Sequence, residues 1–449
     1  MAKVELTRFA AVRAILRSRW PQLALQAVLL GGLLFTILSG LLGTPVGSHN
    51  FGIVYVWIAW WGSLILVLIP LLGRGWCSVC PIPLPGEWLQ RGAVHGPSGK
   101  GIGLNLRWPR RLRNIWLQNA AFGLVAMLSA VILTQPAATA WVLGLMLVAA
   151  LALSLVFERR AFCRYLCPVG GFIGLYSQLA PVELRVKDRA ICAGHTEKTC
   201  YTGNGEGYGC PWQVFPASLA KNTACGLCME CLRTCPYDNL ALNLRAPGVD
   251  LMQPTGRRLD EAFKSFVMLG SAVAYSAVML GPWGGLKAAA YGVGSPAWLG
   301  YALAVLALAF GLLPGSFYLT VIAGGAIRRS LTTARRAFVP LAYGLVPLGL
   351  AAWVAFSLSF VFANASYLGP ALADPLGGGW NLAGLAGVSW RPLMSGLVPW
   401  MQIGALAGGL AWSSGATRRI AVQTGYPAPG APIAFSAALT MALLWLLLG

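Results

Sequence analysis

Residues 20–73 read WPQLALQAVLLGGLLFTILSGLLGTPVGSHNFGIVYVWIAWWGSLILVLIPLLG, and this stretch contains no Lys, Arg, Asp or Glu. A helix that spans the hydrocarbon core of a membrane needs about 20 consecutive apolar residues. The stretch therefore predicts two spanning helices joined by a short turn. The segment between Arg113 and Glu158 is equally free of charged residues and predicts a second such hairpin.

The composition of the whole chain agrees with a membrane protein. Of the 449 residues, 57% are hydrophobic and 10% are charged, whereas a soluble domain carries about 25% charged residues. These values exclude a soluble enzyme, a disordered chain and a fibrous protein. We expect an all-α polytopic membrane protein of about nine spanning helices. The expected spans lie at about 22–43, 51–72, 115–134, 139–157, 263–282, 298–324, 338–362, 392–413 and 432–448.

Two features of these spans bear on function and shape. Pro314 and Gly315 interrupt the segment 298–324 and predict a kink or a re-entrant turn. No buried charged residue is expected in any span, so an ion pump or a proton relay would lack its usual marker. This expectation weakens transport through the C-terminal helices as a function.

The basic residues predict the orientation in the membrane. The chain has 33 Lys and Arg against 13 Asp and Glu, a net charge of +20, and basic loops are retained on the cytoplasmic side. With the N-terminus inside, only Lys287 and Arg391 fall outside. We therefore expect a multi-pass protein of the cytoplasmic (inner) membrane, with the N-terminus in and the C-terminus out. The charge then reflects topology and contact with anionic lipids rather than binding to nucleic acid.

Each predicted hairpin ends at a cysteine–proline motif, CxxCP at Cys77 and Cys80 and CxxxCP at Cys163 and Cys167. Both motifs follow a helix that runs inward, so both lie at the cytoplasmic membrane face. Pseudo-symmetric packing of the hairpins would bring the four thiols together, while two unrelated structural pairs remain the alternative. Disulfides are disfavoured in the cytosol. The remaining options are a metal or cluster held by four thiolates, or a redox-active thiol set.

A polar block between the hairpins and the last five spans carries the strongest motif. Residues 225–236 read CGLCMECLRTCP, which is C-x2-C-x2-C-x3-C-P. This spacing is typical of a bacterial ferredoxin [4Fe-4S] site, in which three close thiolates hold one cluster and the fourth binds a second cluster. The four thiols are those of Cys225, Cys228, Cys231 and Cys235.

The partner motif of a two-cluster module lies upstream. Cys210 precedes a proline, as Cys235 does, so we expect it to complete the cluster held by the first three thiols of the run. Cys235 should then share the second cluster with Cys192 and Cys200. That site is one thiolate short, and His195 is a candidate fourth ligand because histidine replaces cysteine in Rieske centres. The alternative is a solvated His195 beside a [3Fe-4S] or degenerate site.

The eleven cysteines thus divide into four at the membrane face and seven in the ferredoxin-like block. We expect two [4Fe-4S] clusters in the block, with His ligation or a [3Fe-4S] form as the alternatives for the second, and a third cluster or metal at the membrane-face cysteines. With only three histidines and no CxxCH motif, no haem is expected. The expected organisation is two membrane hairpins over 1–159, a small cytoplasmic α+β ferredoxin-like insertion over 160–260, and a five-helix membrane domain over 261–449.

These motifs in this order resemble the NapH/NosR-type membrane polyferredoxins, over about residues 50–245. The first motif departs from the family, which usually has CxxxCP there. The resemblance implies one-electron transfer between the quinone pool or a membrane partner and another redox protein. We expect no catalytic residue in the chain itself; as part of an enzyme, the chain would be a quinol-linked oxidoreductase subunit. The alternative is a redox-sensing or metal-reducing maturation factor for a respiratory enzyme, similar to CcoG-like assembly proteins.

Overall fold

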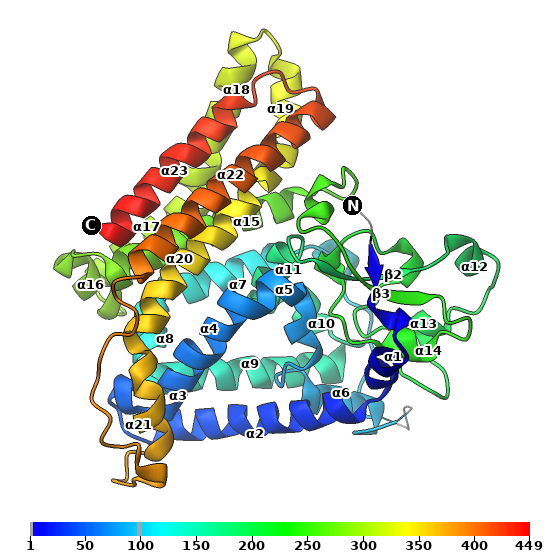
Figure 1. Ribbon diagram of the computed structural model, residues 1–449, viewed down its shortest axis with the longest axis horizontal. Helices are drawn as coiled ribbons and strands as arrows, with labels where there is room; N and C mark the ends of the chain where they lie inside the picture. The colour runs from blue at the N-terminus through cyan, green and yellow to red at the C-terminus, as the bar shows by residue number, and fades with distance from the viewer. Residues whose placement is uncertain (1–2, 97–100) are drawn as a thin grey trace. The chain divides into compact units, whose positions relative to one another are not determined.

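The computed structural model describes residues 3–96 and 101–449, and its described part is mostly helical (Figure 1). Lys100, one of the basic residues expected in the loop after the second span, lies outside the described residues. The chain forms two compact units that interleave in the sequence. The cysteine unit comprises 1–34, 68–118 and 144–253, and the helical unit comprises 35–67, 119–143 and 254–449. The division into three consecutive domains, 1–159, 160–260 and 261–449, stays a prediction.

Long apolar helices indicate a multi-pass membrane protein. In the described part of the chain, seven helices are long and apolar enough to cross a membrane, and each coincides with an expected span. They are Trp20–Leu42, Phe51–Ser78, Pro136–Val156, Leu259–Leu280, Pro296–Ile327, Leu331–Ala373 and Gly430–Leu448.

The other two expected spans are also helical but less regular. The segment 115–134 consists of two helices, α7 (Trp116–Met127) and α8 (Ser129–Thr134), because the backbone leaves the helical region at Leu128. The segment 392–413 corresponds to α22 (Val398–Thr424), which begins later than expected and continues through a pair of arginines. The number of spans therefore stays a prediction.

The expected interruption at Pro314 takes the form of a widened helical turn. The helix Pro296–Ile327 is continuous, and residues Leu308–Leu312 form a π-helical segment directly before the proline. A proline inside a helix lacks an N–H and its ring clashes with the carbonyl four residues earlier. A π segment relieves this clash by widening the turn. Pro70 follows the π segment Leu64–Leu68 in the same way.

The expectation that no span contains a buried charge is wrong at Lys264. This residue lies in α15 (Leu259–Tyr275), within the fifth expected span, and is fully buried. Its ammonium group lies 6.0 Å from the centroid of the Phe122 ring. The argument against transport assumed that no span contains a buried charged residue, and Lys264 removes that assumption.

A small antiparallel sheet lies in the cysteine unit, with strand order β1-β3-β2. The strands are β1 (Val4–Glu5), β2 (Val182–Val186) and β3 (Leu240–Leu244), and Asn243 of β3 lies opposite Glu5 on one side and Glu183 on the other. The N-terminal residues thus complete the sheet of the polar block.

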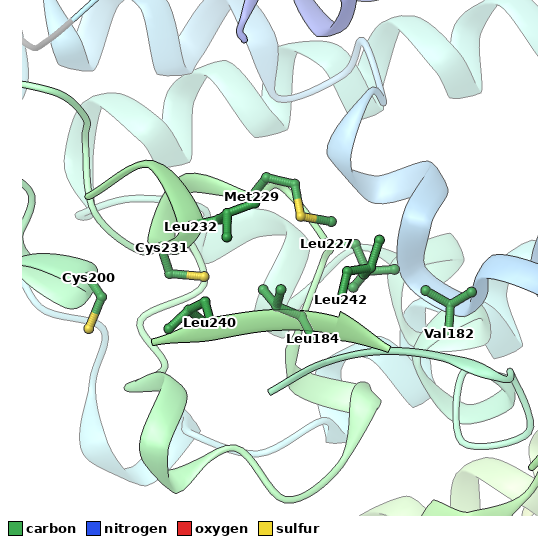
Figure 2. Packing of buried hydrophobic residues seen from close by; sticks show 9 residues of the cluster. All are labelled: Val182, Leu184, Cys200, Leu227, Met229, Cys231, Leu232, Leu240 and Leu242. Carbon is green, nitrogen blue, oxygen red and sulfur yellow. The ribbon is translucent and has the colours of Figure 1, made fainter. Parts of the chain in front are cut away.

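One face of this sheet supports the cysteine run. Leu184, Leu240 and Leu242 pack against Leu227 and Met229 of the run, as Figure 2 shows. Burying such side chains stabilises the folded chain by about 1.5–3 kcal/mol each. The sheet and the ligand-bearing run therefore form one hydrophobic cluster.

The remaining helices fall into the two units. In the cysteine unit they are α1 (Ala10–Arg17), α5 (Ile69–Leu72), α6 (Leu84–Arg91), α10 (Ala161–Tyr165), α11 (Pro168–Tyr176), α12 (Arg189–Ala193), α13 (Thr199–Thr202) and α14 (Glu230–Thr234). In the helical unit they are α3 (Phe51–Ile53), α4 (Trp61–Ser63), α16 (Gly284–Tyr291), α17 (Pro296–Ala307), α18 (Leu313–Ile327), α19 (Leu331–Ala342), α20 (Val346–Asn364), α21 (Leu368–Ala373) and α23 (Gly430–Leu448). Helices α2 (Trp20–Leu42) and α9 (Pro136–Val156) contribute to both units.

Candidate metal centre

The local backbone of the CxxCxxC run is shaped for ligation. Leu227 and Met229 both adopt left-handed conformations, with φ of 51° and 61°. Such residues are uncommon outside glycine and cost free energy. Alternation of right- and left-handed residues turns successive backbone N–H groups toward one concavity, which attracts negative charge. Here backbone N–H groups of Leu227 and Glu230 lower the pKa of the Cys225 and Cys228 thiols, against the larger effect of burial.

Cys210 joins the first three thiols of the run, and we call these four the first thiol set. Burial, with a smaller contribution from the neighbouring Cys210, raises the pKa of Cys225 to about 11 and that of Cys228 to about 12. Burial also raises the pKa of Cys231 well above its usual value, with added contributions from Cys228, Cys225 and Cys210. The four thiols therefore lie close enough for their charges to interact, although Cys210 is outside the run.

Cys192, Cys200 and Cys235 form the second thiol set. Burial, with smaller contributions from the neighbouring Cys235 and Cys192, raises the pKa of Cys200 to about 11. Asn239 connects the other two thiols, since its side-chain Nδ2 donates to Cys192 Sγ over 3.3 Å and its backbone N–H donates to Cys235 Sγ over 3.4 Å. The second set is adjacent to the first, because Cys210 also acts on Cys200.

His195 lies near the second set but has other neighbours. Its Nδ1 is 2.7 Å from the carbonyl oxygen of Ile191, and its ring stacks at a tilt 4.6 Å from that of Tyr237. Only Nε2 is then left to bind a metal. Its role as a ligand stays a prediction.

The four membrane-face cysteines form a third neighbourhood, which we call the membrane-face set. Burial raises the pKa of Cys80 to about 12, with Cys77 and Cys167 adding to the shift. Burial also raises the pKa of Cys163, and Cys167, Cys80 and Cys77 add to it. Cys167 caps the N-terminus of α11, where its Sγ accepts a hydrogen bond of 3.2 Å from the backbone N–H of Gly170. The structure thus places the CxxCP and CxxxCP motifs side by side.

Arg160 lies between the membrane-face set and the first set. Its guanidinium pairs with the buried Glu87 of α6 through two hydrogen bonds and donates a third to the Cys77 carbonyl. Burial opposes the charged form of Arg160, but the charges of Glu87, Cys163 and Cys228 raise its pKa above the ordinary value. A permanent cation is therefore held among the thiols of both sets. Sequence reasoning missed this pair, although both residues flank the cysteine motifs.

Trp212 explains the glycine inside the cysteine run. Its buried indole packs so closely on Gly226 that a Cβ there would overlap the ring. The centroid of the same indole ring also lies 4.2 Å from the guanidinium carbon of Arg74, which is a cation–π arrangement. Arg74 in turn donates to the carbonyl of Thr223, just before the run. The end of the second span is thereby attached to the ligand-bearing loop.

The donor chemistry of the three sets fits iron–sulfur clusters. Throughout residues 3–96 and 101–449, no three His, Cys, Asp or Glu side chains converge on a point that a single metal ion would occupy. A [4Fe-4S] cubane binds each thiolate at a different iron, so it does not require such convergence. Buried thiols with raised pKa values must release protons to bind metal, and the positive charge of the clustered irons supplies that driving force.

Comparisons with known proteins agree with this chemistry. A family model described as a 4Fe-4S binding domain matches residues 53–114 and 139–187. The first segment contains Cys77 and Cys80, and the second contains Cys163 and Cys167.

Two relatives with curated descriptions match part of the chain. The putative electron transport protein YccM of Escherichia coli (strain K12) is 30% identical over 107 residues, which are 23% of this chain and 27% of that protein. The methylamine utilization ferredoxin-type protein MauN of Paracoccus denitrificans is 31% identical over 163 residues, 31% of this chain and 53% of that protein. The chain thus spans about a quarter to a half of the length of these relatives. No solved structure matches.

These matches confirm the resemblance predicted from the motifs. The chain carries a 4Fe-4S binding domain, and it is similar to a putative electron transport protein and to a ferredoxin-type protein.

Proposed function

We propose that this protein conducts electrons through the membrane-face set and the two thiol sets of the polar block, between the quinone pool or a membrane partner and another redox protein. The observation that supports this proposal is the continuity of the three sets within the cysteine unit. Arg160 neighbours Cys163 of the membrane-face set and Cys228 of the first set. Cys231 of the first set neighbours Cys200 of the second. Each set therefore has a neighbour in the next set, which supports the proposed relay.

The ligand allocation that we propose follows these neighbourhoods. Cys210, Cys225, Cys228 and Cys231 would hold one [4Fe-4S] cluster. Cys192, Cys200 and Cys235, with His195 as the candidate fourth ligand, would hold the other. Cys77, Cys80, Cys163 and Cys167 would hold a third cluster or a metal. When bound, such clusters supply the one-electron redox chemistry of the protein.

The chain's own residues set the surroundings of these sites. The hydrophobic cluster around Leu184, Leu240 and Leu242 excludes water from one side of the cysteine run. Backbone N–H groups and Asn239 donate hydrogen bonds to sulfur. Hydrogen bonds to sulfur, net charge and solvent exposure are the features by which proteins tune cluster potentials.

Anaerobic purification of the full chain tests this function. We expect about eight iron and eight sulfide per chain for two [4Fe-4S] clusters, and about twelve of each if the membrane-face set holds a third. Dithionite reduction should produce low-temperature EPR signals of reduced clusters. Stoichiometric zinc without acid-labile sulfide would refute the electron-transfer proposal.

The topology is part of the proposal and has its own test. The distribution of basic residues favours a cytoplasmic polar block and an exported C-terminus. An alkaline phosphatase fusion at Gly449 should be active, and one near Lys221 should be inactive. A green fluorescent protein fusion is the matched control, because it fluoresces only in the cytoplasm. The reverse pattern of both reporters would overturn the assignment.

A further inference from the structure

A polar pocket in the cysteine unit lies beside the first thiol set and is not explained by cluster ligation. Residues from the start of α2, from α6 and from the cysteine run line it, and Cys228 is among them. Its charged lining residues are Arg19, Arg91, Arg160, Arg233, Glu87 and Glu230. The pocket therefore contains four guanidinium groups and two carboxylates.

These charges are arranged as two triads, each with one carboxylate between two arginines. Glu87 pairs with Arg160 and, at 3.4 Å, with Arg91. Glu230 pairs with Arg19 at 3.1 Å and with Arg233 at 2.5 Å. Each triad retains one positive charge, so the pocket has a net charge of about +2 that no carboxylate of its lining neutralises. Side chains of these triads are at most 19% exposed, so solvent screening of this charge is reduced.

Two buried polar atoms of the lining have no partner within the described part of the chain. They are the hydroxyl oxygen of Tyr208 and Nε of Arg19. The Tyr208 ring lies between the two triads, 5.0 Å from the guanidinium carbon of Arg19 and 3.7 Å from that of Arg91. A buried donor without a partner costs about 1–3 kcal/mol. Both donors belong to residues that line the pocket, where a bound acceptor would satisfy them.

The pocket lies where a membrane helix begins. Trp20 starts α2 and is 66% exposed, as expected of an aromatic residue at the membrane–water interface. Gln22, Leu23 and Gln26 of the same helix line the pocket. Basic pockets at the cytoplasmic ends of membrane helices are suited to anionic head groups.

We propose that this pocket binds a phosphate-bearing anion, supplied either by an anionic phospholipid head group or by free phosphate. Arginine forks and a phenolic hydroxyl are the donors that phosphate oxygens accept from most readily. A neutral quinone ring would bring no negative charge to the two excess guanidinium groups of the lining. An anion bound here would place negative charge beside Cys228, so the cluster held by the first thiol set should become harder to reduce.

The test uses the full chain, delipidated in a neutral detergent. Inorganic phosphate is titrated by calorimetry, and in a parallel arm the chain is mixed with phosphatidylcholine vesicles with and without phosphatidylglycerol. The variants are Arg19→Gln, Arg91→Gln and Tyr208→Phe. Arg111→Gln serves as the charge-matched control, because Arg111 is exposed in the short 3-10 helix Arg110–Leu112 and does not line the pocket. Circular dichroism and iron content verify that each variant folds and loads clusters.

Saturable binding that Arg19→Gln and Arg91→Gln each weaken about tenfold, and that Arg111→Gln leaves unchanged, would support the site. Saturation by phosphate alone identifies a free anion, and saturation only by phosphatidylglycerol identifies a head group. Ligand should also lower the midpoint potential of the cluster in the wild-type chain, and Arg19→Gln should need about ten times as much ligand for the same shift. Binding that falls equally in all three arginine variants, or no saturable binding of either probe, would overturn the proposal. Because binding is measured without electron transfer, either result leaves the proposed relay to its own test.

Discussion

Replacing Cys210 with alanine should abolish the cluster held by Cys225, Cys228 and Cys231, whereas replacing Cys192 should leave that cluster intact. The physical reason is proximity. Cys210 raises the pKa of the thiols of all three residues, whereas Cys192 raises the pKa of Cys200. Each variant should lose about four of the eight iron atoms expected in the polar block.

The measurement is an EPR-monitored redox titration of both variants beside the wild type. Each variant should lack one signal, and the two missing signals should differ. Loss of the same signal in both, or loss of neither, would contradict the allocation. His195→Ala is the companion variant: it should shift the potential of the second cluster or convert that cluster to [3Fe-4S], and an unchanged spectrum would show that His195 is no ligand.

The membrane helices and the ligand-bearing run were predictable because each rests on a local pattern. Charge-free stretches of about 20 residues mark spans irrespective of packing. The spacing of Cys225, Cys228 and Cys231 likewise defines a ligand run without reference to the rest of the chain. At Pro314 the same local reasoning predicted an interruption, although the form of the widened turn depends on the fold.

Features that depend on distant parts of the chain were not predictable. Val4–Glu5 is too short to show a strand pattern, yet it completes the sheet by pairing with β3. Arg160 and Glu87 are separated by 73 positions in the sequence, so only the fold reveals their pairing. Lys264 was missed for a different reason. A single charge is easily overlooked when a segment is judged by its average hydropathy, and this one is fully buried.

The buried pair of Arg160 and Glu87 should influence the potentials of the neighbouring clusters with opposite signs. Arg160→Gln removes a cation close to Cys163 and Cys228, so reduction, which adds an electron, becomes less favourable and the midpoint potentials fall. Glu87→Gln removes a carboxylate from the same place, so the potentials rise. A unit charge at about 8 Å in a medium of effective dielectric constant of about 20 contributes about 2 kcal/mol. For a one-electron couple this corresponds to a shift of roughly 50–100 mV.

Stability must be separated from electrostatics, because both variants break a buried ion pair. Removal of one partner of a buried ion pair lowers the free energy of unfolding by about 3–5 kcal/mol. Both variants should therefore have a lower unfolding temperature than the wild type. Only an electrostatic effect changes sign between them. Arg160→Lys retains the charge but loses the bidentate pairing with Glu87, so it should keep the wild-type potentials while still losing stability. If Arg160→Gln and Glu87→Gln shift the potentials in the same direction, loosening of the site explains the change, and the pair does not tune the clusters through its charge.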